Sequence, residues 1–382
     1  MRPVLLLTAA LAALMASSPA PAVAQTVAEP LSPAITGTAS RPFTLRTPKA
    51  GRTRPLVVVV AANGGAETTD YIVPYGVLKD SGVAEVRSLS TEEGPVQLVR
   101  ALRIEADQTL TEFDASEPAG ADIVIVPAQM KPDDAGLIAW LRAQAAQGAV
   151  VVSICEGARV LAHAGLVDGR RATTHWSALK DLERAHPETV WVRDLRYVQD
   201  GPVISTTGVT ASIPASLALI EAIGGRDAAR QTALRLGVGD WSPAHRTDDF
   251  HLSRADFLRA VGSLLAFWPH ETIELPVADG VDEIALALRS EAWSRSYRAR
   301  VATTSDAPEP VTSARGLHII PDDAHRRGRF VVPAGDGPAA GQLDQAIDDM
   351  GARYGPAARR FAVTGMEYVA PTVQPDARSA GL

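Results

Sequence analysis

One stretch near the middle of the chain, residues 149–176, constrains the fold more than any other. It reads AVVVSICEGARVLAHAGLVDGRRATTHW and begins with a short apolar run that is typical of a buried strand. Apolar residues at helical spacing follow Cys155, and Gly165 stands where such a helix should end. The pattern predicts a sharp strand-to-helix turn with Cys155 at its tip, which we call the elbow, followed by the elbow helix. Such a turn needs small neighbours, and the sequence supplies Ser153 and Gly157.

Cys155 is the only cysteine of the 382-residue chain, and the predicted turn favours a role as nucleophile. The thiolate is the reactive form, and a helix N-terminus lowers the pKa of a thiol by placing its positive end at the sulfur. We expect the backbone N–H groups of Glu156 and of Ala128 or Gln129 to bind a developing negative charge. The alternative is that Cys155 is a small buried apolar residue, as most single cysteines are.

Strands and helices alternate along the first two thirds of the chain. Apolar runs predict buried strands at 56–61 and 123–126, with helices between the strands. This order predicts an α/β sandwich around a mostly parallel sheet, in which ligands bind at the carboxyl ends of the strands. Cys155 falls at that edge, and so does Asp70 at the start of a predicted helix. Pro74 cannot donate to the carbonyl of Asp70, so the first turn of that helix is free to lean toward a site.

The composition and the N-terminus predict where the protein acts. The formal net charge of −7 disfavours nucleic acid and anionic membranes as partners. Residues 1–24 are predicted to be a secretory signal peptide, because Arg2 precedes a short apolar run and a small-x-small cleavage site ends at Ala24. The run is too short to span a bilayer, so we expect a periplasmic or secreted protein without stable membrane insertion. Residues 25–54, rich in Pro, Thr, Ser and Ala, are predicted to be a surface linker.

Four motifs resemble one known family in order and spacing. They are TTDYIVPYGVLKDSG, IVIVPAQ, SICEGARVLAHAGLVDGRRATTHW and STTGVTASIPASLALIEAIGG. Residues 56 to about 237 are thereby similar to the ThiJ/PfpI (DJ-type) superfamily, and the resemblance implies a flavodoxin-like, glutamine-amidotransferase-related fold. The sensor domains joined to AraC-type regulators are the most similar branch, although we find no helix-turn-helix domain in this sequence.

The resemblance implies roles for three side chains. The family nucleophile corresponds to Cys155. Its acidic partner corresponds to Asp70, which lies four residues before Pro74. The family histidine after the elbow helix corresponds to His175, which either orients the nucleophile or hydrogen-bonds within its own loop.

Two departures from the family pattern and one rival residue leave alternatives open. Glu156 stands where the peptidase-like members have a histidine directly after the cysteine, so a Cys–His dyad of that type is not expected. Ala128 and Gln129 replace a glycine pair, which puts the oxyanion site in doubt. Glu67 is a second acid three residues before Asp70, and the sequence does not decide between them.

After Pro269 the chain repeats the pattern of its own first half. TIELPVA resembles the first strand, RFVVPA the strand at 123–128, and DQAIDDMGARYGPAARRFA the end of the first domain, while the elbow has no counterpart. We predict a ThiJ/PfpI-like domain at 55–238, a helical connector at 239–270, a degenerate lobe of the same fold at 271–370 and a tail at 371–382. The alternative is an unrelated α/β appendage. A duplicated fold predicts a monomer that imitates the dimer usual in the family, with a homodimer as the alternative.

The residues support two functional hypotheses. The first is an enzyme in which Cys155 attacks a small electrophilic carbon and Asp70 is the general acid/base, in hydration or hydrolysis of a carbonyl, amide or isocyanide-like compound. The second is a non-enzymatic envelope protein that uses the same pocket as a ligand or redox sensor or acts as a chaperone. The histidines show no metal-ligand spacing, and Asn63-Gly64-Gly65 lacks a following phosphate-binding lysine, so neither a metal nor a cofactor is predicted.

Overall fold

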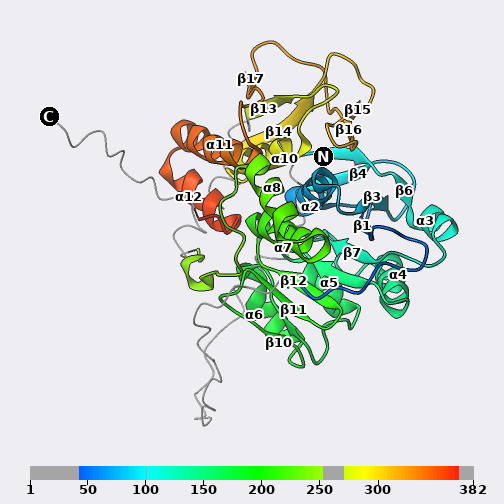
Figure 1. Ribbon diagram of the computed structural model, residues 1–382. Helices are drawn as coiled ribbons and strands as arrows, with labels where there is room; N and C mark the ends of the chain where they lie inside the picture. The colour runs from blue at the N-terminus through cyan, green and yellow to red at the C-terminus, as the bar shows by residue number, and fades with distance from the viewer. Residues whose placement is uncertain (1–42, 100, 253–270, 370–382) are drawn as a thin grey trace, which may run out of the picture. The chain divides into compact units, whose positions relative to one another are not determined.

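A computed structural model describes residues 43–99, 101–252 and 271–369 of the protein (Figure 1). The predicted signal peptide and tail lie outside the described residues, as do most of the predicted linker and of the helical connector. At the start of that connector the structure has only a short 3-10 helix, η2 (Thr247–Asp249). No helix among the described residues is both long and apolar enough to cross a membrane.

A seven-stranded sheet forms the centre of the first lobe, which we define as residues 43–252. Its order is β11-β12-β8-β7-β1-β3-β6, and all neighbours are parallel except β11 and β12. This arrangement confirms the predicted α/β fold with a mostly parallel sheet. The strands are β1 (Leu56–Ala61), β3 (Glu85–Ser90), β6 (Gln108–Thr109), β7 (Ile123–Val126), β8 (Val150–Ser153), β11 (Tyr197–Asp200) and β12 (Val203–Thr206).

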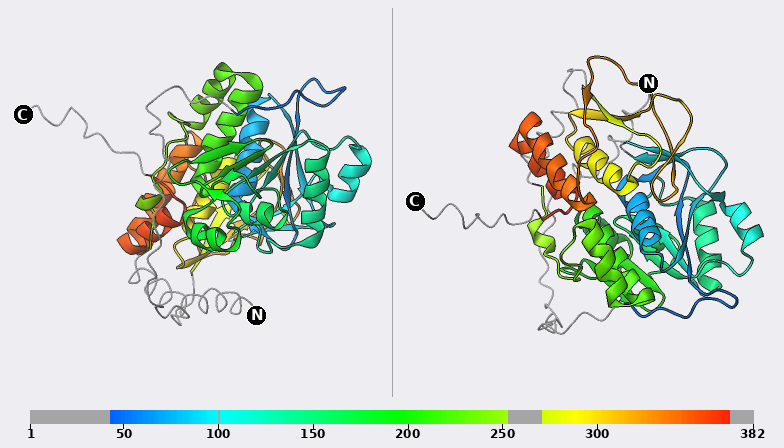
Figure 2. Two further views of the ribbon diagram at one scale, coloured as in Figure 1. Left: turned by 90° about the horizontal axis from the view of Figure 1, so that it is seen from below. Right: turned by 45° about the horizontal axis from the view of Figure 1, so that its top comes forward.

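Helices cover both faces of this sheet because its central strands are buried on both sides. Successive residues of β1 alternate between two cores: Val57 and Val59 pack with α2, α7 and α8, whereas Val58 and Val60 pack with α3 to α6 (Figure 2). The helices of the first lobe are α2 (Thr68–Ser81), α3 (Leu110–Ser116), α4 (Ala135–Ala146), α5 (Gly157–His163), α6 (Trp176–Ala185), α7 (Ser212–Gly224), α8 (Arg226–Leu236) and the 3-10 helix η1 (Val209–Ala211). Two short strands, β9 (Arg171–Ala172) and β10 (Val190–Trp191), pair beside the main sheet.

A second, smaller α/β lobe follows at residues 271–369. Its three-stranded parallel sheet has the order β14-β13-β17, which repeats the order β3-β1-β7 of the first lobe. After β17 the chain passes directly to α11, and no described residue forms a counterpart of β8 and α5. The elements are β13 (Glu271–Pro276), α10 (Glu283–Ser294), β14 (Ala299–Thr304), β15 (Val311–Thr312), β16 (His318–Ile320), β17 (Phe330–Val331), α11 (Ala339–Tyr354) and α12 (Pro356–Gly365).

Local contacts repeat between the lobes as well. In the first lobe the Ser88 N–H donates to an Asp107 carboxylate oxygen at 2.7 Å, and the Asp107 N–H donates back to the Ser88 hydroxyl at 2.9 Å. In the second lobe Thr303 and Asp322 exchange the same two bonds at 2.9 and 3.2 Å. This shared exchange supports a duplicated fold rather than an unrelated appendage.

The two lobes share a sheet and pack two helices together. A five-stranded sheet of order β15-β16-β5-β4-β2 runs across both lobes, with Ile104 of β5 opposite Ile319 of β16. Its first-lobe strands are β2 (Ala66–Glu67), β4 (Val96–Val99) and β5 (Arg103–Glu105). Helix α2 packs closely on α10 at Gly76, where an added Cβ atom would lie only 2.6 Å from Ile284 Cγ1. Absence of a side chain at Gly76 therefore permits the close approach of the two helices.

The sequence-based assignment misses several elements of the first lobe. Helix α3 carries the capping box Thr109-x-x-Glu112, a signal that is present in the sequence. Helix α8 begins directly after Gly225, whose φ of 86° lets the chain turn between α7 and α8. Helix α7 ends at Gly224, and α8 is a further helix that the sequence-based assignment does not contain.

We predict that Gly76→Ala lowers the stability of the whole chain by about 1–3 kcal/mol, because the new methyl group overpacks the contact between α2 and α10. Gly341→Ala is the matched control: Gly341 lies in the exposed part of α11 with no atom near its Cβ position. That change should stabilise the chain by up to about 1 kcal/mol. Urea denaturation of the full-length chain measures both values. Equal effects of the two substitutions would rule out tight packing at Gly76.

Candidate active site

The predicted turn is present between β8 and α5, with Cys155 at its tip. Cys155 has a φ of 55°, a strained conformation for a residue with a side chain, and it is 5% exposed. A Cβ atom on Gly157 would lie 2.1 Å from the carbonyl oxygen of Val126, so only glycine fits there. The sharp turn and its small neighbour are thus found as expected.

Backbone hydrogen bonds hold this turn in place. The Cys155 N–H donates to the carbonyl of Thr207 at 3.2 Å, and the Gly157 N–H donates to the carbonyl of Ile154 at 2.8 Å. These bonds use the amides on either side of Glu156 and not the Glu156 amide itself. The geometry leaves that N–H as the candidate for binding negative charge at the sulfur.

Asp70 lies fully buried in the first turn of α2, at the loop that follows β7. Its Oδ2 accepts a hydrogen bond from the Ala128 N–H at 3.2 Å, and its Oδ1 has no hydrogen-bond partner among the described residues. Burial, and next the charge of Glu67, raise the pKa of Asp70 well above its ordinary value. Burial therefore favours the protonated form of Asp70, in which the carboxyl has an O–H group to donate.

In the loop after β7, the backbone N–H group expected to bind an oxyanion already donates to a side chain of the protein. The Ala128 N–H is taken by Asp70, so it is a donor for substrate only if that bond opens. The Gln129 side chain closes the loop: its Oε1 accepts from the Ala62 N–H at 3.0 Å, and its Nε2 donates to the carbonyl of Pro127 at 3.2 Å. Gln129 thus fixes the loop that carries the Ala128 amide.

The rival acid, Glu67, forms an ion pair with the second lobe. Its Oε1 lies 2.7 Å from Nη2 of Arg295, which also pairs with Glu291. All three side chains are largely buried. The two acids therefore lie in different environments: Asp70 is buried without a cation bonded to it, whereas Glu67 is paired with Arg295.

The environment of Cys155 raises the pKa of its thiol, opposite in sign to the expectation from the helix N-terminus. Burial is the largest cause, and the charges of Asp70, Glu156, Glu67 and Glu367 add to it. The resting form of Cys155 is therefore the thiol.

His175 caps helix α6 and contacts the second lobe rather than the sulfur. Its Nδ1 lies 2.7 Å from the Ser177 hydroxyl, and its Nε2 donates to the carbonyl of Gly365 at 3.2 Å. Its ring nitrogens are each 4.0 Å from a carboxylate oxygen, one of Glu156 and one of Glu367. Among the described residues no hydrogen bond joins His175 to Cys155, so it acts on the site through these neighbours.

Glu156 uses its side chain to stabilise the start of α5 and α6. It accepts from Arg159 at 2.7 Å and from the Ser177 hydroxyl at 3.0 Å. Burial alone would raise its pKa, but His175 and Arg159 outweigh burial and lower it. Glu156 is therefore charged, and its carboxylate is held away from proton-transfer chemistry by its partners.

Two residues of the second lobe at this site are absent from the sequence-based prediction, Arg295 and Glu367. Glu367 is buried with a φ of 50°, and it accepts from the N–H groups of Trp176 at 2.6 Å and Gly208 at 2.8 Å. It also lies 3.3 Å from Nε2 of His245. No motif or periodicity in the sequence marks either residue, because their partners lie far away in the chain.

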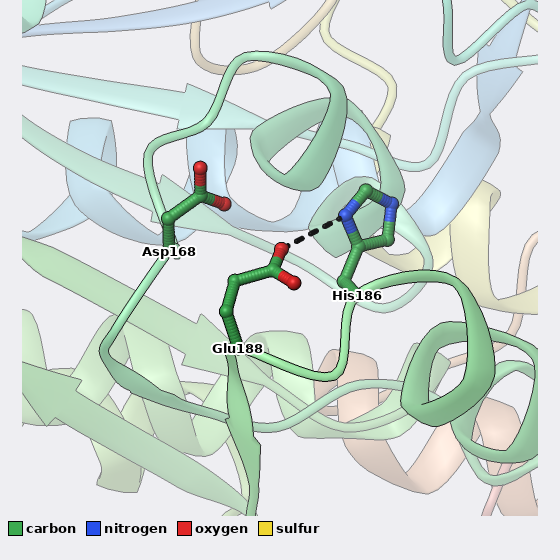
Figure 3. A group of neighbouring side chains, drawn as sticks. All are labelled: Asp168, His186 and Glu188. Carbon is green, nitrogen blue, oxygen red and sulfur yellow. Dashed lines mark ion pairs between the residues drawn. The ribbon is translucent and has the colours of Figure 1, made fainter.

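A separate group of side chains on the first lobe has the composition of a metal site. Figure 3 shows Asp168, His186 and Glu188, whose ligand atoms lie within 4.8 Å of one another, with His186 Nδ1 3.4 Å from Glu188 Oε1. Asp168 and Glu188 are exposed, and exposed carboxylates are common without a bound ion. The group carries no further argument for a metal.

Comparison with known proteins identifies several relatives of the first lobe. Residues 56–222 match the model of the DJ-1/PfpI family. An isonitrile hydratase of Pseudomonas putida is 33% identical over 179 residues, which cover 46% of this chain and 74% of that protein. An HTH-type transcriptional regulator, CdhR of Pseudomonas aeruginosa, is 34% identical over 158 residues, which cover 41% of this chain and 45% of the regulator. The chain thus spans less than half the length of that regulator.

Among solved structures, a DJ-1 superfamily protein of Salmonella typhimurium is 28% identical, with a TM-score of 0.43 and coverage of 49% of this chain and all of that one. The residues matched by the family model include Asp70 and Cys155. The chain belongs to the DJ-1/PfpI family.

Proposed function

We propose that the protein is a cysteine-dependent enzyme that adds water to a small, uncharged electrophile of the isocyanide type. Cys155 is the nucleophile and Asp70 is the general acid/base. The observation that carries this proposal is the buried Asp70 Oδ1, which has no hydrogen-bond partner among the described residues, on a carboxyl that interacts with Cys155 through space and whose pKa is raised by burial. The isonitrile hydratase relative supports the choice of reaction.

The proposed reaction uses a thiol and a carboxylic acid in their neutral forms. The sulfur bonds to the terminal carbon of the isocyanide while Asp70 takes the thiol proton and delivers a proton to the same carbon, which gives a thioimidate. Water then adds across the C=N bond, with its hydroxyl on carbon and its proton on nitrogen. Collapse of this adduct breaks the C–S bond, returns the proton to the thiol and releases an N-substituted formamide. In sum, one isocyanide and one water give one N-substituted formamide, and the thiol and Asp70 are restored.

The charges around Cys155 favour an uncharged substrate. Glu156, Glu67 and Glu367 all act on the sulfur through space, and the arginines paired with Glu156 and Glu67 are already engaged by these acids. A phosphate or carboxylate substrate would meet these acids at low dielectric and be repelled. The small neutral isocyanides fit this environment.

We predict that the full-length protein hydrates simple alkyl isocyanides and that Cys155→Ser abolishes the activity. Asp70→Asn preserves shape and neutrality but removes the transferable proton, so it should lower turnover by about a hundredfold or more. Asp80→Asn, the same change at the other end of α2, is the matched control and should stay within about twofold, since Asp80 pairs with Arg235 and Arg315 away from the sulfur. Chromatography of the released formamide measures the turnover of each variant. Equal turnover in the Asp70 and Asp80 variants would remove Asp70 from the mechanism.

We predict that Cys155 reacts with iodoacetamide with a pH midpoint above about 8.5, the value of a free cysteine. Burial and the surrounding carboxylates disfavour the thiolate, so its fraction rises only at higher pH than in a free thiol. Mass spectrometry of the alkylated protein across pH gives the midpoint. A midpoint below the free-cysteine value would show that the helix N-terminus dominates over burial.

A ligand sensor is the second candidate function, and one cavity favours it. A cavity of about 420 Å³ lies between the lobes and is lined by residues of both, among them Arg196, Leu288 and Glu367. Glu367 also binds the amides of Trp176 and Gly208 beside the candidate active site, so a ligand in this cavity would act on that site. Failure to hydrate any isocyanide, together with ligand-dependent changes in Cys155 labelling, would favour this function.

We infer that the second lobe takes the place of a second copy of the fold, so that the chain is an intramolecular pseudodimer. Helix α2 is covered by α10 of the same chain, and β5 is paired with β16. These contacts fill the helix face and the sheet edge that another subunit would otherwise use. The expected result is a monomer of the full-length protein in multi-angle light scattering. A stable dimer at micromolar concentration would contradict the inference.

A further inference from the structure

Arg295 is a buried cation that reaches from the second lobe into the first. It follows the last turn of α10, is 9% exposed, and is anchored on its own helix by Glu291. Its guanidinium makes two further contacts, one to Glu67 of the first lobe and one to the carbonyl of Gly365. A buried arginine that joins three groups is costly to desolvate, so its contacts matter for where those groups lie.

The contact with Glu67 bears on the position of Asp70. Glu67 is the N-cap residue of α2, and its side-chain Oε1 lies 2.7 Å from Arg295 Nη2. The Glu67 backbone N–H donates to the carbonyl of Ala128 at 2.9 Å, while the Ala128 N–H donates to Asp70. Arg295 therefore holds the residue that fixes both the first turn of α2 and the loop to which Asp70 is bonded.

The contact with Gly365 bears on the opposite side of the site. One carbonyl oxygen, that of Gly365, accepts from Arg295 Nη1 at 2.7 Å and from His175 Nε2 at 3.2 Å. Through Ser177, His175 is linked to the carboxylate of Glu156, the residue directly after the nucleophile. Arg295 is thus connected to Asp70 through Glu67, and to Glu156 through Gly365 and His175.

The charge of Arg295 also balances the groups around the sulfur. Four acids act on Cys155 through space: Glu67 and Asp70 at the start of α2, Glu156 from the elbow, and Glu367 after α12. Arg295 is a cation that also acts on Cys155, and this interaction is favourable when the sulfur is ionised. Loss of this cation would remove the ion pair of Glu67, one of the acids that act on the sulfur.

We propose that Arg295 is a positioning residue of the candidate active site, so that the second lobe completes the site within the same chain. The inference rests on the proposed function only in taking Cys155 as the reactive group. The competing explanation is that Arg295 merely fastens the two lobes together. The two explanations differ in what happens to the sulfur when the charge is removed without loss of the fold.

The test measures the pH dependence of Cys155 alkylation by iodoacetamide in the full-length chain. Arg295→Met should slow alkylation at neutral pH by about tenfold, equivalent to a rise of one unit in the pKa of the thiol. Arg295→Lys should recover part of that loss, because it keeps the charge without the planar fork. Arg289→Met is the matched control: Arg289 is a buried arginine on the same helix, and it donates to the carbonyl of Pro333 inside the second lobe. Its alkylation should match the unsubstituted protein.

A double variant separates electrostatics from packing. Glu67→Gln combined with Arg295→Met removes both charges of the pair, and it should bring alkylation back to within about threefold of the unsubstituted protein. The same alkylation profile for Arg295→Met and Arg289→Met would overturn the proposal, as would a double variant no faster than Arg295→Met. If Arg295→Met does not fold, the lysine and double variants still decide. Alkylation needs no turnover, so absence of isocyanide hydration in the unsubstituted protein would refute the proposed function and leave this test unaffected.

Discussion

The burial of helix α2 on all sides is the constraint on which the rest of this structure depends. Its residues from Thr68 to Leu78 are all buried, because one face lies on the main sheet and another is covered by α10. A helix without a polar face is stable only when it is enclosed in this way. The enclosure has a consequence for chemistry, since Asp70 sits in the first turn of the helix and cannot reach solvent.

The electrostatics of the site follow from that enclosure. Carboxylates that lie in a low-dielectric environment either become neutral or acquire a partner. Burial shifts the pKa of Asp70 toward the first outcome, whereas Glu67 pairs with Arg295, Glu156 pairs with Arg159, and Glu367 accepts from the N–H groups of Trp176 and Gly208. Burial raises the pKa of the Cys155 thiol in the same way. A reaction that takes one proton from the sulfur and returns it is well matched to two groups whose protonated forms are favoured by burial.

The features that could be predicted from the sequence are local in the chain. The elbow is specified by small residues two positions on either side of Cys155, and the packing of Gly157 on Val126 shows why. The strand and helix patterns after Pro269 repeat those of the first half, and the order β14-β13-β17 agrees with that repeat. Helix α3 is also specified locally, because the capping box of Thr109 and Glu112 is present in the sequence.

The features that could not be predicted are contacts between distant segments. Arg295 and Glu67 are separated by 228 positions, and Trp176 and Glu367 by 191. No periodicity relates such residues, because their proximity arises only after both lobes have folded and packed. The sign of the pKa shift of Cys155 belongs to the same class: the helix N-terminus is visible in the sequence, whereas the burial and the acids that outweigh it are tertiary.

Placement of two unlike lobes in one chain removes a restriction that symmetry imposes. In a two-fold dimer every residue that one subunit contributes to its partner's site also occurs beside its own site, where it must be harmless. Here the second lobe has no elbow, so Arg295 and Glu367 lie beside one candidate site only. The covalent link also makes their encounter with that site independent of protein concentration. A chain of this kind can specialise one half as chemistry and the other as its environment, and each half can vary without repeating the change in the other.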